Sequence, residues 1–241
     1  MIVFLFIRSY FRVIGTTITE KLKPSEELIF IADNKFIGGF SGIFVLNGRF
    51  NCFIERNLFN RCASNANTSF ISLVSNYSCF FTNSISNCIC YKNKPMIYGR
   101  NSQFLCSFST FSSNIVENNQ NNSSFIIIAG NTNDFIDINI SKHDSLDNNC
   151  YGLAFRDIYL SLSMRRLIIS NSKGNCGIHM IKTRAQDNIA YSLILNCTSK
   201  DCFLKEFQGS YTTLKFFSFI NHIGNLTLSA SQLQQCKIIE S

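Results

Sequence analysis

The chain has 241 residues, of which 46% are hydrophobic and 15% are charged, and it contains two prolines and no tryptophan. This composition is sufficient to bury a continuous core and excludes an intrinsically disordered chain. The net charge is +7, and both asparagine and phenylalanine are abundant, which suits polar turns around an aromatic and aliphatic interior.

The N-terminal residues do not resemble a targeting segment. The apolar run MIVFLFI has no basic residue before it, and Arg8 and Arg12 interrupt the sequence before any small-residue cleavage site. No stretch approaches the ~18 apolar residues of a membrane-spanning helix. We expect residues 1–40 to form an irregular coil or cap, with a strand at residues 27–31, and residues 41–241 to form one repeat domain.

A repeat with a step of 27 residues begins near residue 41. Its ladders combine cysteine, aromatic, amide and mixed apolar positions: Cys52, Cys79 and Cys106; Phe50, Tyr77 and Phe104; Asn60, Asn87 and Asn114; Phe44, Ile71 and Tyr98. A fixed period of about 20 to 50 residues is typical of solenoids. Short apolar bursts with near-alternating polarity, separated by Asn, Ser and Gly clusters, predict strands and turns rather than helices. The sequence therefore predicts an all-β parallel β-helix of about seven to eight coils of roughly 27 residues.

After residue 123 the repeat length is less regular, but asparagine still recurs at one position of the coils. Asn171, Asn196 and Asn221 follow one another at steps of 25. Asparagine tolerates left-handed backbone at a tight turn, so we expect stacked amides at one corner of the coils. A leucine-rich repeat has a similar period, but the L-x-x-L-x-L pattern and a helical half are both missing.

The cysteines are expected to form a reduced, inward file rather than a metal site. None of the 11 cysteines falls in a C-x-x-C pair, and Cys88-x-Cys90 has no partner pair or nearby histidine. We predict no metal, no cofactor and no catalytic residues. Inward Phe50, Tyr77 and Phe104 would make Tyr77→Asp unfold the central coils.

Basic residues are concentrated in residues 41–116. This segment contains six basic residues and one acidic residue, which gives it a net charge of +5. No alternation of basic and aromatic residues runs through this segment, so we expect a solvated face and no nucleic-acid partner. Seven N-x-S/T sequons occur where about five are expected by chance in so asparagine-rich a chain, so this small excess leaves the compartment open. They begin at Asn67, Asn76, Asn121, Asn122, Asn139, Asn196 and Asn225.

The aromatic-x-Cys steps followed by Asn-Ser turns resemble the right-handed parallel β-helix proteins among the predicted surface proteins of protists such as trichomonads. The resemblance covers residues 41 to about 225. It implies a right-handed helix and a non-catalytic structural or binding module, adhesin-like and displayed on a cell surface or secreted. The partner, otherwise unknown, would be a glycan or a host or cell-surface protein.

The pectin lyases and polygalacturonases share this fold, so an enzyme is the alternative hypothesis. Residues 131–134 (NTND) and 177–179 (GIH) are similar to parts of polygalacturonase signatures. Hydrolysis requires a paired acid and base across the glycosidic bond. No Asp-Asp pair lies between these segments, although four aspartates near them could lie together on one side of the β-helix. They are Asp134, Asp137, Asp144 and Asp147, with His143 as a candidate turn residue beside Asp144.

Overall fold

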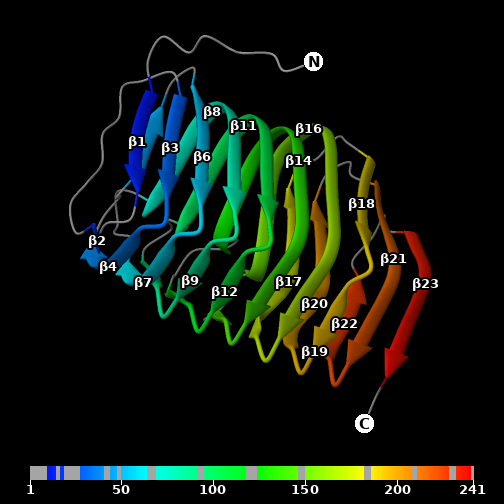
Figure 1. Ribbon diagram of the computed structural model, residues 1–241. Coiled ribbons are helices and arrows are strands. Elements are labelled where there is room, and N and C mark those ends of the chain that lie inside the picture. Colours follow the sequence, from blue (N-terminus) through cyan, green and yellow to red (C-terminus); the bar gives the residue numbers. More distant parts are fainter. Residues whose placement is uncertain are drawn as a thin grey trace.

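The computed structural model describes residues 10–14, 17–18, 28–40, 44–47, 50–63, 69–91, 95–117, 124–145, 150–181, 186–207, 211–227 and 232–239. All regular structure within these residues is β-strand, in one 23-stranded sheet. The described strand pairings are parallel, as in the pairing of Leu28–Ala32 with Asn51–Glu55. The prediction of an all-β parallel solenoid is therefore confirmed (Figure 1).

The strands follow the chain from one end of the solenoid to the other. The first are β1 (Tyr10–Ile14), β2 (Thr17–Ile18), β3 (Leu28–Ala32), β4 (Lys35–Phe40), β5 (Phe44–Asn47), β6 (Asn51–Glu55), β7 (Leu58–Ala63) and β8 (Ile71–Phe81). The central strands are β9 (Ser84–Ser86), β10 (Ile89–Tyr91), β11 (Ile97–Ser107), β12 (Thr110–Ser112), β13 (Ile115–Glu117), β14 (Ser124–Ser141), β15 (Asp144–Ser145) and β16 (Cys150–Ser170). The last are β17 (Lys173–Ile181), β18 (Gln186–Ala190), β19 (Leu193–Leu195), β20 (Thr198–Phe207), β21 (Tyr211–Ile220), β22 (Ile223–Thr227) and β23 (Gln232–Ile239).

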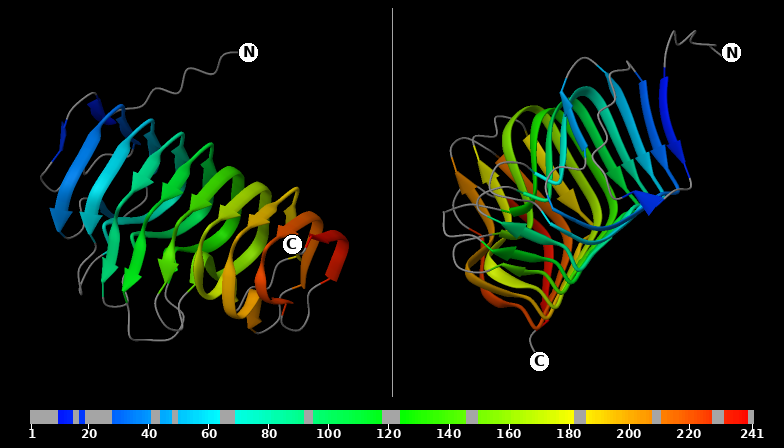
Figure 2. Two further views of the ribbon diagram at one scale, coloured as in Figure 1. Left: turned by 90° about the horizontal axis from the view of Figure 1, so that it is seen from below. Right: turned by 90° about the vertical axis from the view of Figure 1, so that its left-hand side faces the viewer.

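One side of the solenoid is a continuous stack of strands, which we call the broad sheet. Its members, in stacking order, are β1, β3, β6, β8, β11, β14, β16, β18, β21 and β23. β1 lies at one end of the molecule and β23 at the other, and the coils between them line up behind one another (Figures 1 and 2).

The coils turn at two corners built from left-handed backbone. The first corner column, next to the broad sheet, consists of Asp33, Arg56, Thr82, Phe108, Asp137, Arg166, Tyr191 and Phe216, with φ between 50° and 58°. The second corner column consists of Arg61, Asn87, Ser113, Lys142, Asn171, Asn196 and Asn221, with φ between 50° and 56°. Left-handed backbone is unfavourable for most residues. Its repetition at the same two places shows that coil closure imposes it.

A buried polar side chain follows the first corner in the early coils. Asn57 accepts a hydrogen bond at Oδ1 from the backbone N–H of Asn34 (3.0 Å), and Asn83 accepts one from Asn57 in the same way (3.0 Å). Each amide also donates to a carbonyl, as Asn83 does to Ile54 (2.7 Å). The ladder satisfies backbone groups that a tight turn would otherwise leave unpaired in the interior.

The core is a stack of aromatic and aliphatic side chains between the corners. Phe36 and Phe59 are stacked at 4.6 Å between ring centroids, and Phe80 lies 6.3 Å from both Phe59 and Phe111. All four rings are almost fully buried. Further along the solenoid, Ile140 and Ile169 continue the file.

The register within the early coils corrects the predicted ladders by one residue. Cys52 pairs with Ser78, whereas Cys79 pairs with Phe53 and Leu105, so the step is 26 and not 27. A slip of one residue exchanges the two faces of a strand. Cys79 therefore lies half-buried on the outer face, so the three cysteines do not form the predicted inward file, although Cys52 and Cys106 are buried as predicted.

The other predicted ladders are partly correct and partly shifted by one residue. Tyr77 pairs with Asn51 and is half-buried on the outer face, so the prediction that it points inward is wrong. Phe50 and Phe104 are buried as predicted. Phe44 pairs with Ile71, as the 27-residue step requires. Among the remaining predicted partners, Tyr98 pairs with Ser72 and Asn114 is buried, away from the exposed Asn87.

The coils are not uniform in length. Equivalent corner residues are separated by 23 residues between Asn34 and Asn57, 29 between Asp137 and Arg166, and 25 between Asn171 and Asn196. The number of coils accordingly differs slightly from the expected seven to eight. The strand expected at residues 27–31 is present as β3, and β3 and β4 stack in register on β6 and β7. The division at residue 40 stays a prediction.

Candidate binding face

The outer side between the two corner columns forms a sheet that we call the corner-to-corner face. It consists of β4, β7, β9 and β12, the final residues of β14, β16 and β21, and β19. Two side-chain positions per coil point outward, because residues alternate between faces along a strand. The inward position between them holds core residues such as Ile85 and Phe111.

Hydroxyl and amide side chains fill most outward positions of the central coils. One file contains Ser84, Thr110 and Asn139, and the second contains Ser86, Ser112, Ser141 and Ser170. Neighbours in a file are about 4.8 Å apart, and the two files are separated by roughly two residues of strand, about 6.6 Å. No described residue of either file between Ser84 and Ser170 is charged.

The second corner column extends this polar surface with a ladder of asparagines. The Nδ2 group of Asn196 donates to Oδ1 of Asn171 (3.2 Å), and Nδ2 of Asn221 donates to Oδ1 of Asn196 (2.9 Å). All three residues are exposed and have φ near 50°. The predicted amide ladder at a left-handed corner is therefore confirmed.

The first corner column instead carries ion pairs and aromatic rings. Arg56 donates from Nε to Asp33 (2.7 Å), and this guanidinium holds the pKa of the Asp33 carboxyl below its usual value. Arg166 lowers the pKa of Asp137 through the same kind of contact. Tyr191 and Phe216 stack at 4.7 Å. The charges are thus largely compensated within the column.

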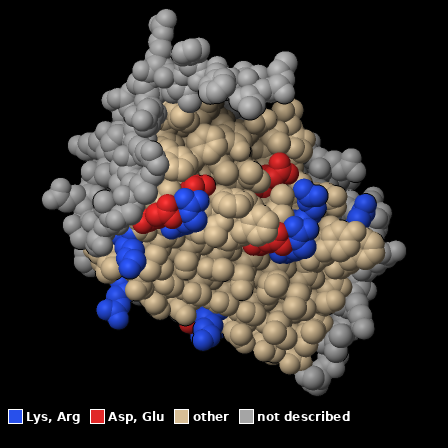
Figure 3. All heavy atoms as spheres, viewed as in Figure 1, with Lys and Arg blue, Asp and Glu red and all other residues tan. Residues whose placement is uncertain are grey.

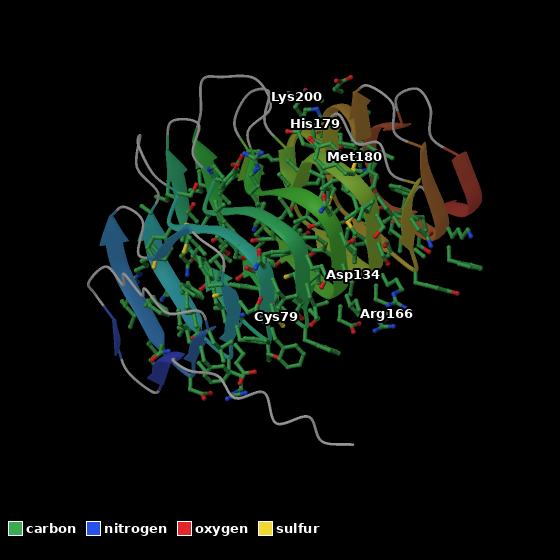
Figure 4. All side chains as sticks on the ribbon, turned by 90° about the horizontal axis from the view of Figure 1, so that it is seen from above. Cys79, Asp134, Arg166, His179, Met180 and Lys200 are labelled. Carbon is green, nitrogen blue, oxygen red and sulfur yellow. The ribbon has the colours of Figure 1, made fainter. Side chains whose placement is uncertain are left out.

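The segments that resemble polygalacturonase signatures lie apart. Asp134 is on the broad sheet, whereas His179 lies across the solenoid from it, on β17 (Figure 4). Asp144 lies beyond the second corner and pairs with Lys173 at 3.0 Å. Asp147 is outside the described residues. Asp137 and Asp144 each have a basic partner from the next coil, Arg166 and Lys173.

His143 follows the second-corner residue Lys142, at the turn where the sequence suggested it, and its side chain is buried. Its Nδ1 donates to the carbonyl of Tyr151 (3.0 Å), and its Nε2 accepts from Nδ2 of Asn114 (2.9 Å). Burial lowers the pKa of His143 to about 4. A residue held as a neutral imidazole inside the core serves packing and corner closure.

The described thiols are mostly buried within the fold. Burial raises the pKa of Cys52 and Cys106, so both remain protonated and unreactive. Cys62 and Cys88 lie on neighbouring coils, where the backbone N–H of Cys62 donates to Sγ of Cys88 (3.4 Å). The described residues contain no group of three or more His, Cys, Asp or Glu side chains arranged to hold a metal ion.

The basic residues of residues 41–116 are dispersed where the structure describes them. Arg56 is paired with Asp33 and Glu55, Arg61 is exposed at the second corner, and Arg100 is exposed on β11. Arg49, Lys92 and Lys94 are outside the described residues. Figure 3 shows charges in small mixed clusters on a largely uncharged surface.

Comparison with protein-family models, curated proteins and solved structures finds no match to this chain. The structure shows a parallel β-helix, and no match supports the resemblance to protist surface proteins or to pectin lyases. The described part of the chain contains no helix with the length and apolar character needed to cross a membrane.

Proposed function

We propose that this protein is a non-catalytic β-helix module that binds its partner through the corner-to-corner face. The observation that carries the proposal is the pair of uncharged, in-register files of hydroxyl and amide side chains over β9, β12 and β14. These side chains are fixed by a rigid stack, so little conformational entropy is lost when a ligand orders them. A fold alone does not define a function, so we argue the function from the side chains of this surface.

The chemistry of the face favours a neutral glycan. Serine, threonine and asparagine side chains both donate and accept hydrogen bonds, as sugar hydroxyls do. An uncharged array provides no long-range attraction for a polyanion or a polycation. The regular spacing presents the same groups on successive coils, which suits a ligand that is itself repetitive.

Display on a cell surface, in the manner of an adhesin, is proposed from the resemblance to protist surface proteins. Labelling of the full-length native protein with a membrane-impermeant reagent on intact cells tests this directly. Labelling equal to that of an intracellular marker would contradict surface display and would leave the binding proposal standing.

A matched pair of threonines tests the binding face. Thr110 lies on the corner-to-corner face and Thr198 beyond the second corner; both are exposed, and their backbone N–H groups donate to Asn83 (2.9 Å) and Ser172 (3.0 Å). We expect Thr110→Glu to reduce retention on insoluble cellulose and chitin about tenfold by adding an uncompensated charge, whereas Thr198→Glu is retained like the original protein. Equal retention of both variants, or no retention of the original protein, would contradict glycan binding by the corner-to-corner face.

The alternative, a carbohydrate-active enzyme, would require an acid and a base across the scissile bond. The separation of Asp134 from His179 and the ion pairing of Asp137 and Asp144 favour binding without turnover. Assays on polygalacturonate and pectate test this alternative, and we expect no release of unsaturated products or reducing ends. Sustained turnover that is lost in Asp134→Asn would replace our proposal with an enzyme.

A further inference from the structure

The outer face of the broad sheet carries an apolar strip in its central coils. Phe53 contacts Tyr77 with ring centroids 5.6 Å apart, and Phe81 contacts Phe108 at 5.4 Å in an edge-to-face arrangement. Phe108 is 52% exposed, and Leu105 is half-buried beside these rings. Exposed clusters of this kind on a rigid sheet commonly mark interaction surfaces.

Mixed charges flank the strip at both ends. On one side, Arg56 pairs with Asp33 and with Glu55 (2.5 Å). On the other, Arg166 pairs with Asp137, and the exposed Arg165 lies next to it. In Figure 3, charged clusters lie on either side of a mostly uncharged area of this face, and a separate acidic group lies at its edge. An aromatic centre with a charged rim is the common anatomy of a protein–protein interface.

The register gives this surface an internal symmetry of charge. One file on the outer side of the broad sheet contains, on successive coils, Glu55, Phe81, Ser107, Ile136 and Arg165, of which Ser107 is itself buried. Glu55 and Arg165 carry opposite charges and are each two coils from Ser107. A two-fold axis that runs along the strands at the level of Ser107 reverses the stacking order, so it places Glu55 of one copy opposite Arg165 of the other.

We propose that the broad sheet packs against a second copy of this chain about this two-fold axis. Leu105 and Phe108 lie at the same level as Ser107, so each meets its own equivalent across the axis. Phe81 of one copy meets Ile136 of the other. The contact is isologous, so the pairing of Glu55 with Arg165 occurs twice. The same axis places Arg56 opposite Arg166, and each of these guanidiniums keeps its own carboxylate partner, Asp33 or Asp137. Asp134 of one copy lies opposite Cys79 of the other.

The corner-to-corner face remains outside this contact, because it lies beyond the first corner. A dimer would therefore present two polar faces to one ligand, which raises avidity for a repetitive partner. The dimer does not depend on the proposed glycan binding, and its test requires no ligand.

The first experiment measures association of the full chain by sedimentation equilibrium. We expect a concentration-dependent dimer, and we expect Phe108→Asp to weaken it at least about a hundredfold, because a charge is buried at the axis without a partner. Ile168→Asp is the matched control: Ile168 is 40% exposed and lies on the corner-to-corner face. A chain that remains monomeric at about 100 μM, or a dimer that Phe108→Asp leaves intact, would overturn the proposal.

The second experiment reverses charges. Glu55→Arg and Arg165→Glu are each expected to weaken the dimer about tenfold, since each places like charges opposite one another. The double variant restores the opposite charges between copies but does not restore the contact of Glu55 with Arg56 within a copy. Recovery to within about threefold of the original dissociation constant supports the two-fold arrangement; a double variant no better than the single ones contradicts it. Cooperative melting of every variant, followed by circular dichroism, confirms that each is folded.

Discussion

The imidazole of His143 and the side-chain amide of Asn114 are joined by a buried hydrogen bond of 2.9 Å between neighbouring coils. Asn114 also accepts from the backbone N–H of Cys88 (2.9 Å), which fixes its amide with Nδ2 toward the histidine. Because Nδ2 can only donate, Nε2 of His143 must accept, and the proton of the neutral ring lies on Nδ1, facing the carbonyl of Tyr151.

This arrangement predicts a loss of stability in mild acid. The pKa of His143 is about 4 in the folded protein and near 6.5 when the chain is unfolded, so the unfolded state takes up the proton first as the pH falls. The contribution of His143 is complete above pH 6.5, decreases between about pH 6.5 and 4, and amounts to roughly 3 kcal/mol over that range. Urea unfolding at several pH values measures it.

The His143→Asn variant provides the comparison, because it keeps a polar corner side chain but has no group that titrates in this range. The carboxylates of the original protein and of the variant titrate in the same way. The difference in the free energy of unfolding between the two should therefore depend on pH only between about 4 and 6.5. Parallel pH profiles for both proteins would show that His143 is not held neutral.

A second buried amide predicts the opposite effect of substitution. Asn133 is completely buried, and neither Oδ1 nor Nδ2 has a hydrogen-bond partner among the described residues. We expect Asn133→Leu to stabilise the protein by about 1–3 kcal/mol, because the desolvation cost of the unpaired amide is removed. Thermal unfolding followed by circular dichroism gives the shift.

Asn114→Leu is the matched control for this substitution. The Asn114 amide bonds to Cys88 and His143, so the same change leaves both partners unpaired and should destabilise the protein by about 1–3 kcal/mol. If Asn133→Leu is destabilising as well, an ordered water molecule or a shifted side chain satisfies the amide in solution.

The corrected register gives a third prediction, on the aromatic residues of β8. Phe80 is buried between Phe59 and Phe111, whereas Tyr77 faces outward. We expect Phe80→Asp to abolish cooperative melting, because an unpaired charge in the core costs several kcal/mol, and Tyr77→Asp to retain it. Loss of cooperative melting in Tyr77→Asp alone would instead favour the 27-residue register.

The architecture was predictable from the sequence because the periodicity and the turn residues each indicate it independently. Apolar bursts, asparagine clusters and a recurring step all indicate stacked strands, and an error of one residue in the step does not change that conclusion. The register was not predictable to the same accuracy. The coils that contain Cys52, Cys79 and Cys106 advance by 26 residues, whereas these cysteines are 27 apart, and a strand exchanges its faces with every residue of slip.

The candidate surfaces differ in how far the sequence could reveal them. The ladder of Asn171, Asn196 and Asn221 was predictable because one residue type recurs at one step. The file that joins Glu55 to Arg165 was not, since its steps change from 26 to 29 and its members have no common chemistry. Similarly, His143 occupies the position of Asn114 in the next coil, and only the three-dimensional pairing relates the two residues.

The asparagine ladder provides the last prediction, which separates backbone strain from side-chain bonding. Asn196 has φ of 52° and takes part in both amide bonds of the ladder. Asn196→Ala removes these bonds and leaves an ordinary residue in left-handed backbone, so we expect a loss of about 1–2 kcal/mol. Asn196→Gly removes the same bonds but adopts this φ without strain, so it should lose less than Asn196→Ala. Urea denaturation of the two variants measures the difference, and a glycine variant less stable than the alanine variant would show that the corner does not impose left-handed backbone in solution.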